Sequence, residues 1–200
     1  PSVRDELRPD DRDPELDLYD PANPNQPPYS AEFLARYRAA QLARVRRITA
    51  WVRETLAELQ ARNTGEMERG FVVHRTLADP RFLDPSIDPN DRKPRWCYLG
   101  NPETVNTGPV GLARFCTLRS WLSQWSVDDS RANGLLCAAA VHAPMLVIEN
   151  SADDAVPQPH THQVFAAAAS TDKTMHVIHG ANHYYAGQPG PLAEATQLTL

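Results

Sequence analysis

The sequence is poor in cysteine, glycine and long apolar runs. Three of its 200 residues are cysteines and nine are glycines. The cysteines are widely spaced and form neither a Cys-x-x-Cys pair nor the even set of a disulfide framework, which favours a reducing, cytoplasmic compartment. No apolar run is long enough to cross a bilayer, and no basic, apolar leader typical of a signal peptide is visible. We therefore expect a soluble protein with no membrane partner.

An excess of basic side chains is also lacking. The formal net charge is −5, and residues 1–28 hold eight acidic and three basic side chains, so the rest of the chain is neutral overall. A nucleic-acid-binding protein needs a basic stripe or patch. The sequence therefore indicates no nucleic-acid partner.

Proline, in contrast, is abundant, at 18 residues. This number favours long, irregular connections between helices and strands. Residues 1–29 are acidic and proline-rich, and they are predicted to form a connector without regular structure.

A helical region is predicted next, over residues 30–137. Ser30 is a typical N-cap, an apolar 3-4 spacing follows, and Asn63 and Gly65 are suited to the C-terminus, which predicts one long amphipathic helix or two with a kink. Short strands are predicted at 71–74 and 96–99 within a loop-rich stretch. Residues 112–125 return to helical periodicity and are rich in aromatic side chains.

The C-terminal residues 138–200 follow a different pattern. Strands are predicted at 141–149 and 173–179, and helices at 160–170 and 191–200. Strands joined by a helix are typical of a parallel α/β sheet, and two strands are too few to form one alone. We therefore expect the sheet to include strands beyond these two.

Acidic and imidazole side chains follow the two predicted strands. Asp153 and Asp154 come after the first, and His183 comes after the second. Open α/β sheets place their sites at the carboxyl ends of the strands. A carboxylate there can orient a histidine that acts as a general base. The pattern alone does not indicate which of the two aspartates orients the histidine.

The stretches ENSADDAVP and HVIHGANHYYAG resemble the C-terminal end of an α/β-hydrolase. The resemblance covers residues 141–200. That family has an Asp-x-x-x-Pro loop after its penultimate strand and a histidine loop after its last one. The resemblance implies that Asp153 is the acid of a catalytic triad and His183 its base. It also implies that residues 30–137 are a cap and that an ester or related acyl bond of a small molecule is hydrolysed, without a cofactor.

The nucleophile of that family is missing from the sequence. No serine lies in a Gly-x-Ser-x-Gly motif, on which the family places it. The resemblance therefore implies that an N-terminal hydrolase segment or a companion chain supplies the serine. The candidates for contact with substrate are aromatic: Trp96, Trp121, Trp125 and Tyr184. The stretch 96–99, together with Trp121 and Trp125, is the candidate for an apolar pocket under the cap.

Two other functions fit parts of the pattern. Five histidines between His160 and His183 could suggest a zinc site, but the pair 160 and 162 begins a helix, whereas 176 and 179 alternate across a strand. Because these positions do not converge, no metal site is predicted. The other alternative is a non-catalytic α/β scaffold that binds a ligand or a partner, which the missing nucleophile favours.

Overall fold

The computed structural model describes residues 18–73, 79–108 and 114–200. These residues form helices, one antiparallel pair of strands and one parallel pair. The expected α/β character is confirmed at this coarse level. The described chain divides into two compact units. The first holds the residues up to Pro80 together with Glu103–Ala132, and the second holds Arg81–Pro102 and Asn133–Leu200.

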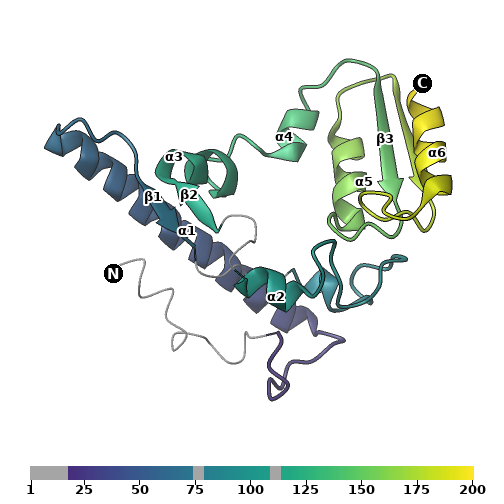
Figure 1. Ribbon diagram of the computed structural model, residues 1–200, viewed down its shortest axis with the longest axis horizontal. Coiled ribbons are helices and arrows are strands. Elements are labelled where there is room, and N and C mark those ends of the chain that lie inside the picture. The colour runs from purple at the N-terminus through teal and green to yellow at the C-terminus, as the bar shows by residue number, and fades with distance from the viewer. Residues whose placement is uncertain (1–17, 74–78, 109–113) are drawn as a thin grey trace. The chain divides into compact units, whose positions relative to one another are not determined.

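Helix α1, Ala31–Arg62, is the longest element of the first unit (Figure 1). The Ser30 side chain accepts a hydrogen bond from the N–H of Phe33, and Asn63 ends the helix with a φ of 50°. Asparagine adopts this left-handed conformation more readily than most residues. Both predicted ends are confirmed, and the helix is continuous rather than two helices joined at a kink.

Two short strands pair antiparallel beside α1. They are β1, Gly70–Val72, and β2, Phe115–Thr117. Two helical turns follow β2 directly: α3, Leu118–Ser120, and the π-helical turn η5, Trp121–Trp125. The predicted helix over 112–125 is therefore wrong for 115–117, where pairing with a distant strand overrides the local helical periodicity. His74, which ends the predicted strand 71–74, and residues 112–113, which begin the predicted helix, lie outside the described residues.

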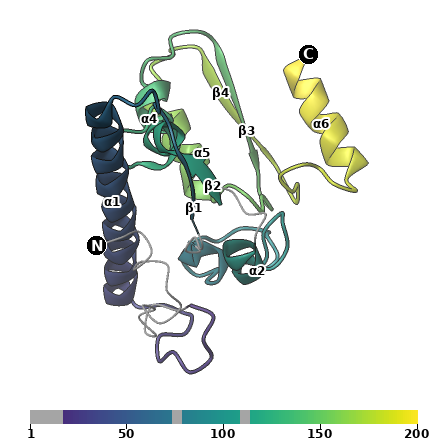
Figure 2. The ribbon, with the colours of Figure 1, turned by 60° about the vertical axis from the view of Figure 1, so that its left-hand side comes forward.

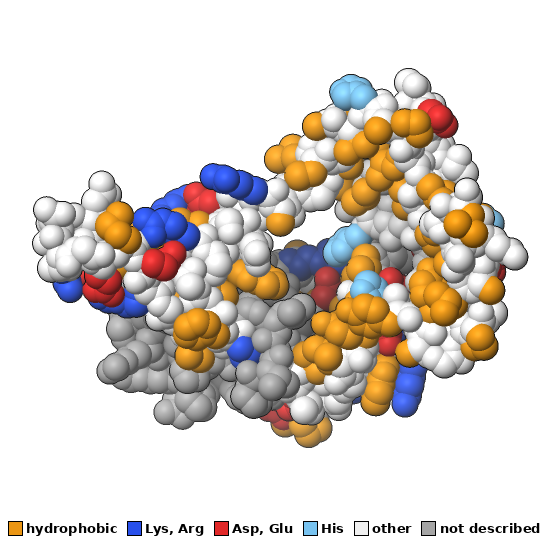
Figure 3. Space-filling view, turned by 45° about the horizontal axis from the view of Figure 1, so that its top comes forward, with side chains coloured by type: hydrophobic (Ala, Val, Ile, Leu, Met, Phe, Trp, Pro, Cys, Tyr) orange, Lys and Arg blue, Asp and Glu red, His pale blue; other side chains and the backbone are white. Residues whose placement is uncertain are grey.

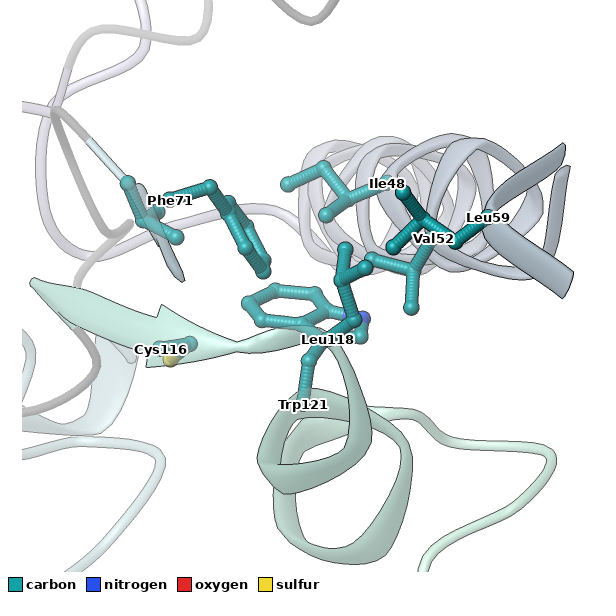
Figure 4. Close-up of a cluster of buried hydrophobic side chains, with 8 residues drawn as sticks. Ile48, Val52, Leu59, Phe71, Cys116, Leu118 and Trp121 are labelled. Carbon is teal, nitrogen blue, oxygen red and sulfur yellow. The ribbon is translucent and has the colours of Figure 1, made fainter. Parts of the chain in front are cut away.

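The core of the first unit lies between α1 and this strand pair (Figure 4). Trp121 is only 3% exposed, and its indole N–H donates to the Thr49 hydroxyl at 3.0 Å. The ring of Phe71 lies between those of Trp51 and Trp121, at centroid distances of 5.1 and 5.8 Å. The buried members of the core are Ile48, Val52, Leu59, Phe71, Val73, Cys116, Leu118 and Trp121.

The second unit is built on a parallel pair of strands. Strand β3, Met145–Asn150, leads through helix α5, Gln158–Ala167, to β4, Lys173–Ile178, and then to helix α6, Pro189–Thr199. The predicted order of strand, helix, strand and helix is confirmed, although β3 begins after Pro144 rather than at residue 141. The two strands lie between α5 and α6 (Figures 1 and 2). The shorter elements of the chain are the 3₁₀ turn η4, Pro80–Phe82, and helices α2, Pro102–Thr107, and α4, Gly134–Ala138.

The outer edge of β3 has no strand beside it in the described part of the chain. The N–H of Met145 donates to Asp172 and that of Ser151 to Ile178, so the odd-numbered residues of β3 bond to β4. The backbone groups of Leu146 and Ile148 must then point to the other side. No described residue bonds to them. These backbone groups could pair with a further strand.

Residues 81–102 belong to the second unit with the parallel strands. The strand predicted at 96–99 is wrong: only an isolated bridge, between Cys97 and Gly100, forms there. The division into a connector at 1–29, a cap at 30–137 and a C-terminal part at 138–200 stays a prediction. Of the predicted connector, residues 18–29 are described, and Leu18 and Tyr29 are buried. Among the described residues, no helix combines the length and apolar character needed to cross a membrane.

Candidate active site

The first loop of the site follows β3 and is organised by the carboxylate of Asp153. Its Oδ1 accepts hydrogen bonds from the backbone N–H groups of Ala155 and Val156, both at 2.8 Å. Aspartate often closes a turn in this way. Pro157 then occupies the N-cap position of α5, so the loop is short and its acidic side chain is fixed at the carboxyl end of β3.

The second loop follows β4 and presents His183. Gly180, with a φ of 71°, permits the turn out of the strand, and Gln188 closes the loop by bonding to the N–H of Asn182 and the carbonyl of Gly180. Asn182 in turn binds both the N–H and the carbonyl of Ala186. These bonds give the loop a defined backbone, so the position of His183 is set by its neighbours.

The two loops also bond to each other. The Asn150 side chain donates to the carbonyl of Asn182 at 3.0 Å and accepts from the Tyr185 hydroxyl at 3.0 Å. The N–H of Ala152 donates to the carbonyl of Ala181, also at 3.0 Å. Side chains at the carboxyl ends of β3 and β4 are thereby held close together.

Asp153 and His183 form the centre of the site. The His183 Nδ1 lies 3.1 Å from both carboxylate oxygens of Asp153. The Asp153 side chain is 17% exposed and that of His183 is 30% exposed, so the pair is sheltered but open to solvent. A carboxylate at Nδ1 favours the tautomer with the proton on that nitrogen, which leaves Nε2 free to accept a proton.

Asp154 contacts the same histidine differently. Its Oδ1 accepts from the backbone N–H of His183 at 3.2 Å, and its carbonyl accepts from the N–H of Tyr98 at 2.9 Å. The geometry therefore pairs Asp153 with the imidazole and Asp154 with the backbone of the loop.

Two aromatic rings adjoin the imidazole. The Tyr184 ring stands nearly perpendicular to that of His183 at a centroid distance of 4.6 Å, and the Tyr98 ring lies 6.0 Å from it. Tyr184 is 67% exposed, so most of its surface is open to a ligand. Trp96 is half-exposed in the same unit, with the Lys93 ammonium over its ring at 4.5 Å. Tyr98 lies within the stretch 96–99, which the sequence makes a candidate for an apolar pocket, but no local pattern predicts its contact with His183, 85 residues later.

The other two predicted substrate contacts lie in the first unit. Trp121 is a core residue there, and Trp125 is 38% exposed on η5. Their contact with substrate stays a prediction.

A nucleophile is not bonded to His183 within the described residues. No serine, threonine or cysteine side chain of that part of the chain hydrogen-bonds to its ring. Cys97, in the same unit, donates its thiol to the carbonyl of Gly100 at 3.2 Å. Burial raises the pKa of this thiol, and the nearby Asp154 carboxylate raises it further, which disfavours the reactive thiolate form.

Two of the other histidines pair with separate carboxylates. The His162 Nε2 lies 2.8 Å from the buried carboxylate of Glu149, and that of His176 lies 3.2 Å from Glu194. Within the described ranges, no three histidine, cysteine or acidic side chains come together in a group that could hold a metal ion.

Comparison of the chain with models of known protein families found no match, and searches against curated proteins and solved structures found none either. The geometry of the site is therefore the basis for a functional assignment.

Proposed function

We propose that this chain supplies the acid and base of a Ser-His-Asp triad in an α/β-hydrolase-like enzyme that cleaves a carboxylic ester or related acyl bond. The observation that carries the proposal is the pairing of the His183 Nδ1 with the Asp153 carboxylate at 3.1 Å. Each residue follows a strand of a parallel pair, and the two strands are adjacent. This is the arrangement that a carboxylate and a general base need in such a triad.

The chemistry follows from the free nitrogen of the imidazole. Nε2 of His183 takes the proton of a serine hydroxyl while the serine oxygen attacks the acyl carbon. The imidazolium that forms is stabilised by the Asp153 carboxylate, and it then gives the proton to the leaving alkoxide as the ester bond breaks. A water molecule, activated by the same nitrogen, hydrolyses the acyl-enzyme and regenerates the serine.

The serine in this proposal comes from an N-terminal hydrolase segment or a companion chain. The open edge of β3 supports this part, because the unpaired backbone groups of Leu146 and Ile148 can bind a further strand. Leu146 is also 40% exposed, although residues of parallel sheets are normally covered on both faces. Figure 3 shows hydrophobic side chains on the surface of the unit that holds these strands.

The substrate is proposed to be a small molecule with an apolar part next to its acyl bond. The exposed ring of Tyr184 and the ring of Tyr98 adjoin the imidazole, and aromatic faces bind apolar or aromatic groups. Trp96 is a further candidate for this contact in the same unit.

Fluorophosphonate labelling of the natively purified protein, read by intact mass and peptide mapping, tests the proposal. We expect label on a serine outside the present sequence, with labelling lost in His183→Ala and retained in His142→Ala. His142 is an exposed histidine of the same unit and is a matched control. Label on a serine of this chain would overturn the proposed source of the nucleophile.

A non-catalytic scaffold for a ligand or partner is the second candidate function. The observation that favours it is that no described nucleophile is bonded to His183. Absence of label in a folded sample, together with ligand or partner binding that survives His183→Ala, would establish this alternative and overturn the triad.

A further inference from the structure

The segment Arg81–Pro102 donates three hydrogen bonds to backbone carbonyls of the loop that carries Asp153, which we call the acid loop. The N–H of Asp91 donates to the carbonyl of Ser151 at 2.9 Å, and the N–H of Tyr98 donates to that of Asp154 at 2.9 Å. Between them, the Arg92 guanidinium donates to the carbonyl of Asp153, also at 2.9 Å. Three of four successive carbonyls in the acid loop are therefore held by one distant segment.

Arg92 is the buried centre of this contact. Its side chain is 3% exposed and pairs with Asp88, which is 1% exposed, at 2.9 Å. The guanidinium also donates to the carbonyl of Arg81 at 3.1 Å and lies over the ring of Phe82 at 4.5 Å. An arginine can make all these contacts because its planar guanidinium group donates hydrogen bonds in several fixed directions at once.

Stability alone is a weak explanation for this ion pair. The Asp88 Oδ1 is buried without a hydrogen-bond partner among the described residues, which costs free energy. Buried ion pairs often add little net stability over apolar side chains, and their best-attested use is to select one arrangement. The arrangement selected here is the docking of residues 81–102 onto the acid loop.

We propose that Arg92 is a positioning residue for the Asp153–His183 pair. By holding the Asp153 carbonyl, Arg92 fixes the backbone from which the carboxylate extends, and the carboxylate then holds the Nδ1 proton of His183. Asp91 reinforces the same loop, because its carboxylate accepts from the Ser151 hydroxyl, which itself accepts from the N–H of Gly180 at 2.8 Å. The effect on catalysis rests on the proposed function, whereas the effect on loop geometry does not.

Amide hydrogen exchange and ¹⁵N NMR of the His183 ring test this proposal in the full chain. The first variant, Arg92→Lys, keeps the positive charge beside Asp88 but removes the planar guanidinium group. The second, the double variant Asp88→Asn/Arg92→Met, leaves no unpaired buried charge. The control is Arg95→Met, which changes an exposed arginine of the same segment. Exchange at Val147, in the middle of β3, reports whether the sheet is intact.

In both Arg92 variants we expect the N–H groups of Ala155 and Val156, which bind Asp153, to exchange about tenfold faster or more, as the loss of a charge-assisted hydrogen bond implies. The His183 ring should shift toward the tautomer protonated on Nε2, while exchange at Val147 and the behaviour of the control stay as in the wild type. A purely structural role would not change the tautomer while the sheet stays protected.

The proposal would be overturned if folded Arg92→Lys showed the same exchange rates at Ala155 and Val156, and the same His183 tautomer, as the wild type. Faster exchange at Val147 in the double variant would mean that its sheet is disturbed. The test then rests on the Arg92→Lys variant alone. Failure of fluorophosphonate labelling would overturn the proposed function but would leave these two readouts unchanged, so the two failures are distinguishable.

Discussion

Asp153 binds the imidazole of His183, whereas its neighbour Asp154 binds the backbone N–H of the same residue. The two aspartates thus hold the same histidine through different groups. The first sets the tautomer and can stabilise the protonated ring. The second fixes the loop from which the ring extends. The proposed role of this chain as the acid–base part of a hydrolase depends on these two contacts.

Replacing Trp121 tests the core of the first unit. Because the ring is 3% exposed and packs against α1 and Phe71, Trp121→Ala should lower the free energy of unfolding by about 3–5 kcal/mol. Trp125→Ala, at a residue 38% exposed, should lower it by about 1 kcal/mol or less. Chemical denaturation followed by circular dichroism measures both, and equal losses would contradict the burial that distinguishes the two residues.

The cysteines should differ in reactivity toward iodoacetamide. Cys137 is exposed, whereas burial raises the pKa of both Cys97 and Cys116 and lowers the fraction of thiolate near neutral pH. Cys137 should therefore be alkylated at least about tenfold faster than the other two, which should react fully only after unfolding. Intact mass and peptide mapping over time give the rates. Rapid alkylation of Cys97 in the folded protein would show that its thiol is not shielded.

The ion pair between Arg53 and Asp129 should make stability depend on acid pH. The hydrogen bond from Arg53, at 2.6 Å, and a second from Ser126, at 2.7 Å, lower the pKa of Asp129. A carboxyl group whose pKa is lowered by folding stabilises the protein above its unfolded pKa, about 4, and loses this effect as pH falls through the folded pKa.

Asp129→Asn should accordingly lower the melting temperature at pH 7 and have little effect near about pH 2, where the wild-type group is protonated as well. Asp128→Asn removes a more exposed pair with Arg46 at 3.2 Å and should have a smaller effect at pH 7. Melting curves at the two pH values measure this, and an equal effect of Asp129→Asn at both would contradict it.

Local signals in the sequence predict much of this structure. Ser30 and Asn63 mark the ends of α1, and the apolar runs before Asp153 and His183 mark β3 and β4. The Asp153–His183 pair follows from these elements, because adjacent parallel strands end at the same edge of a sheet.

Interactions between distant residues account for what the sequence did not predict. Residues 115–117 have helical periodicity but pair with β1, some 45 positions earlier, and only the fold brings these strands together. The docking of residues 81–102 onto the acid loop depends on single backbone bonds and on Arg92, which no periodic pattern marks. The i,i+4 spacing of Asp88 and Arg92 was the one available signal, but in a stretch rich in proline and turn residues it does not predict a helix.

The most direct test of the central claim is the rate of ester hydrolysis by the natively purified protein after Asp153→Asn and, separately, after Asp154→Asn. Asparagine at 153 cannot stabilise an imidazolium, and a comparable substitution in serine proteases lowers turnover about 10⁴-fold. We predict a loss of about this size in kcat for Asp153→Asn and a change within about tenfold for Asp154→Asn, whose side-chain oxygen can still accept the His183 N–H. Equal rates for the two variants, or a larger loss for Asp154→Asn, would contradict the assignment of Asp153 as the acid that orients His183.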